Sequence, residues 1–468
     1  MTNAMPRSAV RASLAGGVAL GVVYALSPLT VWFIAVAVGL FVWAGRGLPD
    51  RERRWLIALL TAAVMLRLLA LAVLFLTTDH FKTVSFFWDG DGVYLKQRAL
   101  WIRNVWLDRP IAPVDFENAF NREYGWTSYL YWIAYPQYLV GPAPYGIHLL
   151  NVAVFVTTSI LLYRVVRAAY GPSAALLGLA ILLFLPTPFL WSISAMKESL
   201  YVFLEALALA AAIAVLRSKN WAVKMLALGV IVAAVSTNGA VRAGAFAISV
   251  LGLAAGVAGS MVVRRLSLVV VVLALLPLAG YQMLNRPSAQ TAIMSQLESS
   301  AVLHIGHVRT EGHSYRALDQ RFYSGHPATE PISTMTPMEG ARFVIRAVAG
   351  FVLAPLPWQV ESLQEILFVP QQVAWYLLAL LGMVGLVAGL RRDALVTCLL
   401  AGFTAAGAAA IALNSGNIGT MVRHRDTLVP FIVWLSALGA VELASKLARL
   451  GATPGQDRLD IEARAVCQ

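Results

Sequence analysis

The sequence contains little charge and almost no cysteine. Only 13% of its 468 residues are Asp, Glu, Lys or Arg, whereas a soluble domain carries roughly 25% charged residues. Cys398 lies in an apolar run and Cys467 lies at the end of the sequence, so they form neither a disulfide framework nor a cysteine-based metal motif. There is no internal repeat and no low-complexity tract. These absences exclude a disulfide-rich domain and argue against a soluble one.

Apolar residues dominate the composition: 59% of the chain is hydrophobic and the mean hydropathy is +0.71. A helix that spans a bilayer needs about 20 mostly apolar residues. We therefore expect an all-α polytopic membrane protein with about 12 transmembrane helices. The first stretch is too long, and too closely followed by the second, for a cleaved signal peptide. The expected spans are 8–26, 29–44, 56–77, 146–168, 173–192, 199–217, 222–238, 243–262, 265–284, 368–390, 395–413 and 427–447.

The distribution of basic residues predicts the orientation. With both termini in the cytoplasm, the cytoplasmic side holds 19 bases and 7 acids, whereas the outer side holds 16 of each. Short cytoplasmic loops normally carry the excess of Lys and Arg. The net charge of +12 is thus a signal of membrane topology, and we expect no nucleic-acid partner.

Two outer loops are long, and the domain prediction follows from them. Residues 1–284 form an N-terminal transmembrane module that contains the first loop, 78–145, and residues 285–367 form the second loop. Residues 368–450 form the C-terminal helices and 451–468 a cytoplasmic tail. Loops longer than about 15 residues are usually functional or disordered, and these are rich in aromatic residues. We expect them to contain interfacial helices and the functional site.

The first loop holds the most suggestive acids. Asp89 and Asp91 alternate with glycines in "WDGDGVY", and a moderately amphipathic helical pattern follows over 92–106. Such a helix is expected along the membrane surface. One interpretation is that Asp91 only caps this helix. The other is that the two carboxylates face a cavity, where one acts as a general base or a metal ligand.

A family resemblance rests on this segment and the region after it. "GDGVYLKQRALWI" approximates a D-x-x-x-Y…A-x-x-L motif, and residues 144–209 show a helix ending in basic residues, an Ala/Leu-rich helix closed by proline and a polar elbow. Over 56–260 the chain resembles the GT-C superfamily of membrane glycosyltransferases, in particular bacterial relatives of protein mannosyltransferases and aminoarabinose transferase. The usual Asp-Glu pair is absent, so either Asp89 or Asp91 corresponds to the family's base. The motif places Tyr94 among the substrate-binding residues.

This resemblance implies transfer of a sugar from a polyprenyl-phosphate donor to a lipid, glycan or protein acceptor. The leaving phosphate needs cations, and arginine suits phosphate through its fork of donors. Each of these bases has a plain alternative, because single bases at helix ends commonly snorkel to the interface. Glu198 is a ligand for an acceptor or metal, or an acid that complements a helix dipole. The substrate-binding candidates are Lys197, Glu198, Arg242, Arg423, His424 and Arg425.

Three further features bear on the site. Pro186 and Pro188 should break the fifth span near its outer end, and broken backbone at membrane depth is tolerated where it lines a cavity. The apolar stretch 340–358 is an interfacial helix or an additional span. Arg67 and Glu205 lie inside spans, where charges usually pair, so we expect them to contact each other.

Histidines gather in the second loop. His304, His307 and His313 lie near Glu311, but their spacing matches no standard zinc motif. We favour a loop that covers the substrate over a metal site. The sequence identifies no cofactor, and a divalent cation is the alternative left open.

Three functions compete. The first is the GT-C type glycosyltransferase, the second an envelope polysaccharide polymerase or ligase that uses polyprenyl-diphosphate-linked glycans, and the third a transporter or flippase. The first predicts that Asp89 or Asp91 shares an outer pocket with the basic segment 423–425. The resemblance places the protein in the bacterial inner membrane as a multi-pass protein.

Overall fold

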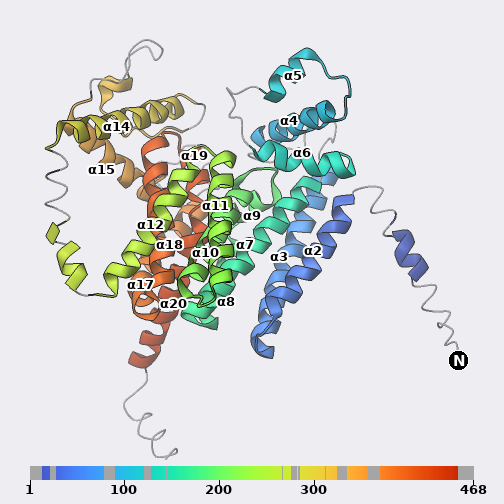
Figure 1. Cartoon of the computed structure of the whole chain (residues 1–468), viewed down its shortest axis with the longest axis horizontal. Coiled ribbons are helices and arrows are strands. Elements are labelled where there is room, and N and C mark those ends of the chain that lie inside the picture. The colour runs from blue at the N-terminus through green and yellow to red at the C-terminus, as the bar shows by residue number, and fades with distance from the viewer. Residues whose placement is uncertain are drawn as a thin grey trace, which may run out of the picture. The chain divides into compact units, whose positions relative to one another are not determined.

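A computed structural model shows a helical protein (Figure 1). All regular secondary structure of the described residues is helical, and one isolated bridge joins Ser314 to Asn417. The described residues are 13–19, 21, 28–77, 90–120, 128–142, 146–265, 267–272, 274–275, 282, 285–310, 313–323, 335–356 and 369–451.

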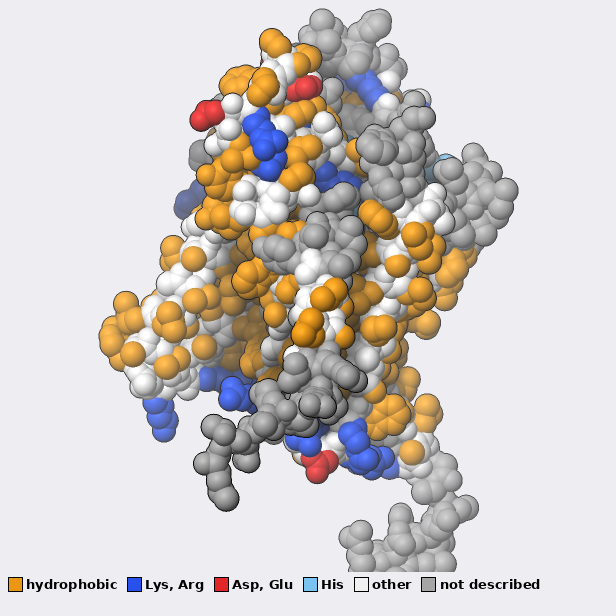
Figure 2. Space-filling model, turned by 90° about the vertical axis from the view of Figure 1, so that its right-hand side faces the viewer, with side chains coloured by type: hydrophobic (Ala, Val, Ile, Leu, Met, Phe, Trp, Pro, Cys, Tyr) orange, Lys and Arg blue, Asp and Glu red, His pale blue; other side chains and the backbone are white. Residues whose placement is uncertain are grey.

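Within this described part, nine helices are long and apolar enough to cross a membrane. Figure 2 shows hydrophobic side chains spread over much of the described surface on this face, which suits contact with lipid tails. The chain is therefore a multi-pass membrane protein. The expected spans 8–26 and 265–284 fall partly outside the described residues, so the count of 12 is not confirmed. The nine helices are α2 (Pro28–Gly45), α3 (Asp50–Thr77), α7 (Gly146–Tyr170), α10 (Glu198–Arg217), α11 (Trp221–Val241), α12 (Ala245–Val263), α17 (Val369–Arg392), α18 (Ala394–Asn414) and α20 (Val429–Gly451).

The fifth expected span is a bent pair of helices. Helix α8 (Pro172–Phe184) ends just before α9 (Pro186–Ile193), and the two axes differ by 61°. Proline lacks the N–H group that would continue the helical ladder, so the predicted break is confirmed. Counting this pair as one span raises the number of candidate spans in the described residues to ten.

Shorter helices occupy the two long loops. Helix α4 begins at the motif, as predicted, and in Figure 1 α4 and α6 lie across the ends of the steeper α3 and α7. Helix α15 has 17 residues and is not among the candidate spans, and Thr336 and Glu339 form a capping box at its start. These helices are α4 (Gly90–Trp106), α5 (Pro113–Phe120), α6 (Tyr129–Val140), α14 (Pro287–Val308), the 3-10 helix η1 (Gln320–Tyr323), α15 (Pro337–Leu353) and α19 (Ile418–Arg425).

The pattern of a surface helix predicts that Arg103 lies on the polar face of α4 and Arg98 on its apolar side; the first expectation is wrong. Arg103 is buried, and its Nε donates to the carbonyl oxygen of Gln137 on α6 at 2.7 Å. Arg98 is fully buried and donates to the carbonyl oxygen of Ala119 on α5 at 3.4 Å. Because α5 and α6 pack on α4, they supply acceptors to arginines that a lone surface helix would expose to water.

The chain forms two compact units, neither continuous in sequence. Unit 1 consists of Met1–Arg164 and Leu183–Ser249, and unit 2 consists of Val165–Leu182 and Val250–Gln468. The expected boundary at residue 284 stays a prediction. Each unit is described by itself below.

Arg67 anchors the interior of unit 1, but not through Glu205. Its guanidinium donates to Ser192 Oγ at 2.7 Å and to the carbonyl oxygens of Ala63 and Leu183 at 3.1 and 3.0 Å. The last carbonyls of a helix lack partners within that helix, so the break after α8 offers Leu183 as an acceptor. Glu205 instead lies beside Tyr201, one turn earlier on α10. The predicted Arg67–Glu205 pair is therefore wrong.

Glycines allow two helices of unit 2 to approach closely. A Cβ atom on Gly385 of α17 would overlap the carbonyl oxygen of Leu435, and one on Gly439 of α20 would overlap that of Leu381. Small residues at such crossings are typical of membrane helices, where close packing replaces the hydrophobic effect. This crossing fixes α17 against α20.

Candidate functional site

In unit 1, side chains of α6 and α7 hold the backbone turn between α9 and α10. The carbonyl groups of residues 193–196 all accept hydrogen bonds. His148 Nδ1 donates to the first at 2.7 Å, Asn151 Nδ2 donates to the second and fourth at 2.7 and 2.8 Å, and the Tyr129 hydroxyl donates to the third at 3.0 Å. His148 and Asn151 are fully buried. An irregular turn is therefore held in a defined conformation.

Two predicted site residues follow this turn directly. Lys197 is the N-cap residue of α10 and is half-buried, and Glu198 begins the helix and is buried. A carboxylate in the first turn is favoured by the helix dipole, so the location of Glu198 agrees with the interpretation that it complements this dipole. The cradle formed by His148, Asn151 and Tyr129 thus also places Lys197 and Glu198.

The motif helix α4 reaches the same cradle. Asp91 lies in its first turn, although the Asp91 side chain lies beyond what the structure describes, and Asp89 falls outside the described residues. Lys96 Nζ lies 3.3 Å from His148 Nε2. Sequence reasoning missed both residues of this contact, which joins α4 to the cradle.

Tyr94 lies on the same helix and is half-buried. The guanidinium carbon of Arg98 lies 5.4 Å from the centroid of its ring. Burial lowers the pKa of Arg98, and the electrostatic effect of Tyr94 opposes this change. Packing against Arg98 is thus a structural role for Tyr94, and its contact with substrate stays a prediction.

Arg242 lies at the end of α11, beside the first turn of α10. It is the C-cap residue of α11 and precedes Gly244, whose φ of 79° suits glycine in the turn to α12. Its guanidinium carbon lies 5.4 Å from the centroid of the Tyr201 ring. Tyr201 in turn contacts Glu205, so Arg242, Tyr201 and Glu205 form one cluster.

In unit 2, the three basic residues of α19 differ in their surroundings. Arg425 is 1% exposed, and burial lowers its pKa to about 10. Its Nη1 donates to the carbonyl oxygens of Phe351 and Ala354 at 3.3 and 3.1 Å, and its Nη2 donates to Gln372 Oε1 at 2.5 Å. These bonds give Arg425 a structural role. Arg423 and His424 are half-buried and remain the better candidates for a ligand.

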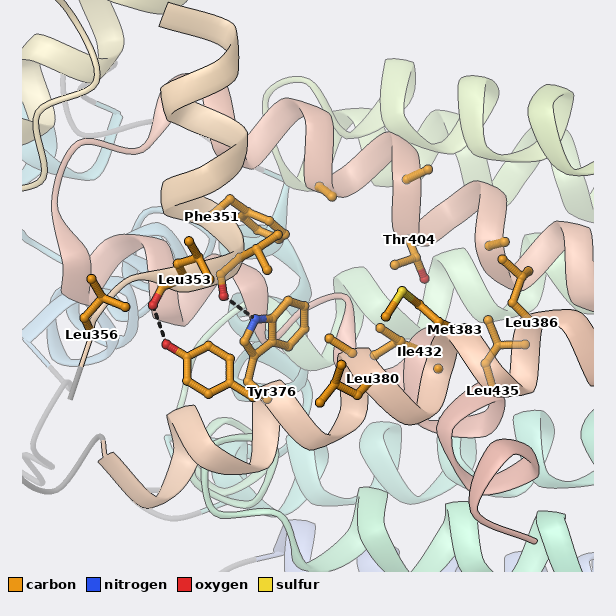
Figure 3. Close-up of a pocket in the computed structure, with 17 residues that line it drawn as sticks. Phe351, Leu353, Leu356, Tyr376, Leu380, Met383, Leu386, Thr404, Ile432 and Leu435 are labelled. Atoms are coloured by element: carbon orange, nitrogen blue, oxygen red, sulfur yellow. Dashed lines mark hydrogen bonds between the residues drawn. The ribbon is translucent and has the colours of Figure 1, made fainter. Parts of the chain in front are cut away.

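Next to Arg425, unit 2 contains an apolar groove of about 900 Å³ (Figure 3). Its walls come from the end of α15 and from α17, α18 and α20. The Tyr376 hydroxyl donates to the carbonyl oxygen of Leu353 at 2.5 Å, and Trp375 Nε1 donates to that of Val352 at 3.1 Å. The remaining lining is mainly aliphatic, including Leu380, Met383, Leu386, Ile432 and Leu435. Trp375 both lines the groove and contacts Arg425, whose guanidinium carbon is 4.7 Å from its ring centroid.

Two histidines of α14 form hydrogen bonds with backbone groups of other segments. His304 Nε2 accepts from the backbone N–H of Ala317 at 3.2 Å, and His307 Nδ1 donates to the carbonyl oxygen of Asn414 at 2.7 Å. Burial lowers the pKa of His304 to about 4. Glu311 falls outside the described residues. Across the described ranges, no three His, Cys, Asp or Glu side chains are placed to hold a metal ion.

The structure thus groups the predicted residues by unit. Lys197, Glu198 and the helix of Asp91 share the cradle of unit 1, whereas α19 belongs to unit 2, so a pocket common to both stays a prediction. His148 and Asn151 could have been flagged in the sequence, because polar residues inside an apolar segment are usually functional or paired. Comparisons with family models, with curated proteins and with solved structures found no match to this chain.

Proposed function

We propose that this chain is a GT-C type glycosyltransferase that moves a sugar from a polyprenyl-phosphate-linked donor to a lipid, glycan or protein acceptor. The observation that carries the proposal is the apolar groove of unit 2. Trp375, which lines this groove, packs against Arg425 of the basic helix α19. The ligand class that fits such a site combines a hydrocarbon chain with an anionic headgroup.

The groove supports the lipid part of this ligand. It lies among membrane-spanning helices. A hydrocarbon chain bound against its aliphatic walls gains roughly 25 cal/mol for each Å² of apolar surface removed from water. Arg423 and His424 on α19 supply basic groups for a phosphate. A transporter for polar solutes usually has charged groups at mid-membrane, whereas the residues that line this groove include no charged side chain.

The proposed reaction is a single displacement at the anomeric carbon. A hydroxyl or amine of the acceptor attacks that carbon, the bond from carbon to the phosphate oxygen breaks, and polyprenyl phosphate leaves with the electron pair. Asp91 or Asp89 takes the proton from the acceptor, a contribution of about 10²–10⁴-fold. In unit 1, Lys197 and Arg242 are the bases proposed to stabilise the negative charge that develops on the phosphate.

The excess of basic residues in the short loops of one side supports a cytoplasmic location of both termini. On this topology the two long loops face the outer side of the inner membrane. A polyprenyl carrier is confined to the membrane, which agrees with the multi-pass architecture.

The test is the fate of the carrier lipid. The full chain is reconstituted into liposomes with a polyprenyl-phosphate donor bearing a radiolabelled sugar, and envelope extract is added as the source of acceptor. Release of free polyprenyl phosphate with label in the acceptor supports the proposal. Release of polyprenyl diphosphate from a diphosphate-linked donor instead indicates a polymerase or ligase, and movement of an intact donor across the bilayer indicates a flippase; either result contradicts it.

A further inference from the structure

We propose that Lys96 and His148 form a positioning pair that couples α4, the helix of Asp91, to the turn that carries Lys197 and Glu198. This inference rests on the function proposed above for these residues. Neither Lys96 nor His148 needs to touch a substrate in this role.

The bonds of His148 fix the direction of the link. A carbonyl oxygen only accepts hydrogen bonds, so His148 Nδ1, 2.7 Å from the carbonyl oxygen of Ile193, carries the proton. The neutral ring then has a lone pair on Nε2, which accepts from the Lys96 ammonium group at 3.3 Å. The result is one chain of donors, from Lys96 through His148 to Ile193. Both ring nitrogens are used, so this imidazole acts through its neighbours and not as a proton carrier.

The two sides of the link are fixed to different elements. The turn is held by Asn151 as well as by His148, so it forms part of the framework of α7. The C-terminal half of α4 is attached to α6 through Arg103, whose Nε donates to the carbonyl oxygen of Gln137. Lys96 lies in the N-terminal half, next to the motif. Its bond to His148 therefore sets the position of the Asp91 turn relative to the turn after α9.

Such a link is useful because an acid and the groups that bind a donor must keep a fixed separation. A misplacement of about 1 Å can reduce a rate about 100-fold. Sites are held to this precision by a supporting layer of hydrogen bonds behind the residues that touch the substrate. A fully buried histidine with both nitrogens bonded meets this description.

Amide substitutions of His148 separate the two halves of the link. His148→Asn keeps an N–H donor near the position of Nδ1, so the bond to Ile193 is preserved while the acceptor for Lys96 is lost. His148→Gln reaches the position of Nε2 and has the opposite effect. Lys96→Met removes the ammonium group, and Lys96→Arg restores a donor. Hydrogen exchange of the full chain in nanodiscs is followed by mass spectrometry over 90–97 and 193–200.

We expect Lys96→Met, His148→Asn and their double variant to raise exchange over 90–97 by similar factors, with the turn still protected. His148→Gln should instead raise exchange over 193–200. In the transfer assay the first three variants should lower kcat about 100-fold with little change in KM, and Lys96→Arg should recover most of the rate. Unchanged exchange over 90–97 in Lys96→Met, or effects of the single variants that add in the double variant, would overturn the coupling.

The exchange measurement also separates this inference from the proposed function. If exchange changes as expected but the wild-type protein transfers no sugar, the coupling stands and the proposed function fails. If the wild-type protein is active and Lys96→Met loosens α4 without lowering kcat, the positioning role fails while the proposed function stands.

Discussion

The guanidinium carbon of Arg425 lies 4.7 Å from the centroid of the Trp375 indole ring. The same guanidinium binds the last carbonyls of α15, and the indole N–H binds the carbonyl oxygen of Val352. One buried cation thus joins α15, α17 and α19 at the end of the groove. This arrangement leads to different expectations for neighbouring arginines of α19.

Arg425→Ala should destabilise the protein much more than Arg423→Ala. The first change removes bonds from a charged donor to buried acceptors, each worth about 1.5–3 kcal/mol, whereas Arg423 is half-buried. Thermal unfolding in detergent, followed by intrinsic fluorescence, measures the difference. Equal melting temperatures for the two variants would show that Arg425 is not structural.

Ala405→Trp should block the groove, because this exposed alanine of α18 lines it. Ala409 lies one turn later on the same helix, is exposed and does not line the groove, so Ala409→Trp is the matched control. We expect binding of a fluorescent polyprenyl phosphate to weaken at least 10-fold in the first variant only, with both melting temperatures near that of the wild type. Equal binding by the two variants would remove the groove from the account.

Gly385→Ala should destabilise the crossing of α17 and α20, because its Cβ would meet the backbone of Leu435. Overpacking of this kind typically costs about 1–3 kcal/mol. Gly229 on α11 has no atom within 4 Å of such a Cβ, which makes Gly229→Ala the control. The yield of folded protein after size-exclusion chromatography should fall only for Gly385→Ala, and an equal yield would contradict the close approach.

Arg67 should couple energetically to Ser192 and not to Glu205. Residues joined by a hydrogen bond show coupling of about 0.5–3 kcal/mol in double-mutant cycles, and Arg67 donates to Ser192 Oγ at 2.7 Å. Cycles with Arg67→Ala and either Ser192→Ala or Glu205→Gln, measured by urea unfolding in mixed micelles, compare the pairs. Coupling to Glu205 alone would restore the ion pair that the sequence suggests.

Stability should fall between about pH 6.5 and pH 4 through His304. Its pKa is lowered to about 4 by burial, with a further contribution from nearby His307, and its ring packs against Tyr315 and Phe343. In this window the unfolded state binds a proton that the folded state does not, so the free energy of unfolding decreases as the pH falls, by up to about 3 kcal/mol. His304→Gln keeps an acceptor for Ala317 but no proton to gain. The fall in melting temperature from pH 7 to pH 5 should therefore shrink in this variant; an unchanged fall would assign it to other groups.

Much of the fold follows from patterns that the sequence displays directly. Apolar length predicts the spans, Pro186 predicts the break between α8 and α9, and the pattern after Asp91 predicts α4. These features depend on local chemistry: hydrophobic length, a missing N–H group, and the periodicity of a single helix.

The contacts of the charged residues depend instead on acceptors that only the folded chain supplies. Arg67 binds a carbonyl group freed by the break after α8, and Arg103 binds a carbonyl group of α6. The basic residues of α19 look equivalent in the sequence, yet Arg425 is buried and donates to carbonyl groups at the end of α15. His148 gains its role from a turn 45 residues later in the chain. Backbone acceptors have no sequence signature, so these partners could not be read in advance.

The most direct test of the central proposal measures polyprenyl phosphate released from a sugar-bearing donor by wild-type, Asp89→Asn and Asp91→Asn proteins in liposomes. The account predicts release by the wild type and a loss of about 10²–10⁴-fold in one of the two variants, with donor binding and melting temperature retained. Release at the wild-type rate by both variants and by the double variant would contradict the account. So would the absence of release by the wild-type protein with every donor and acceptor offered.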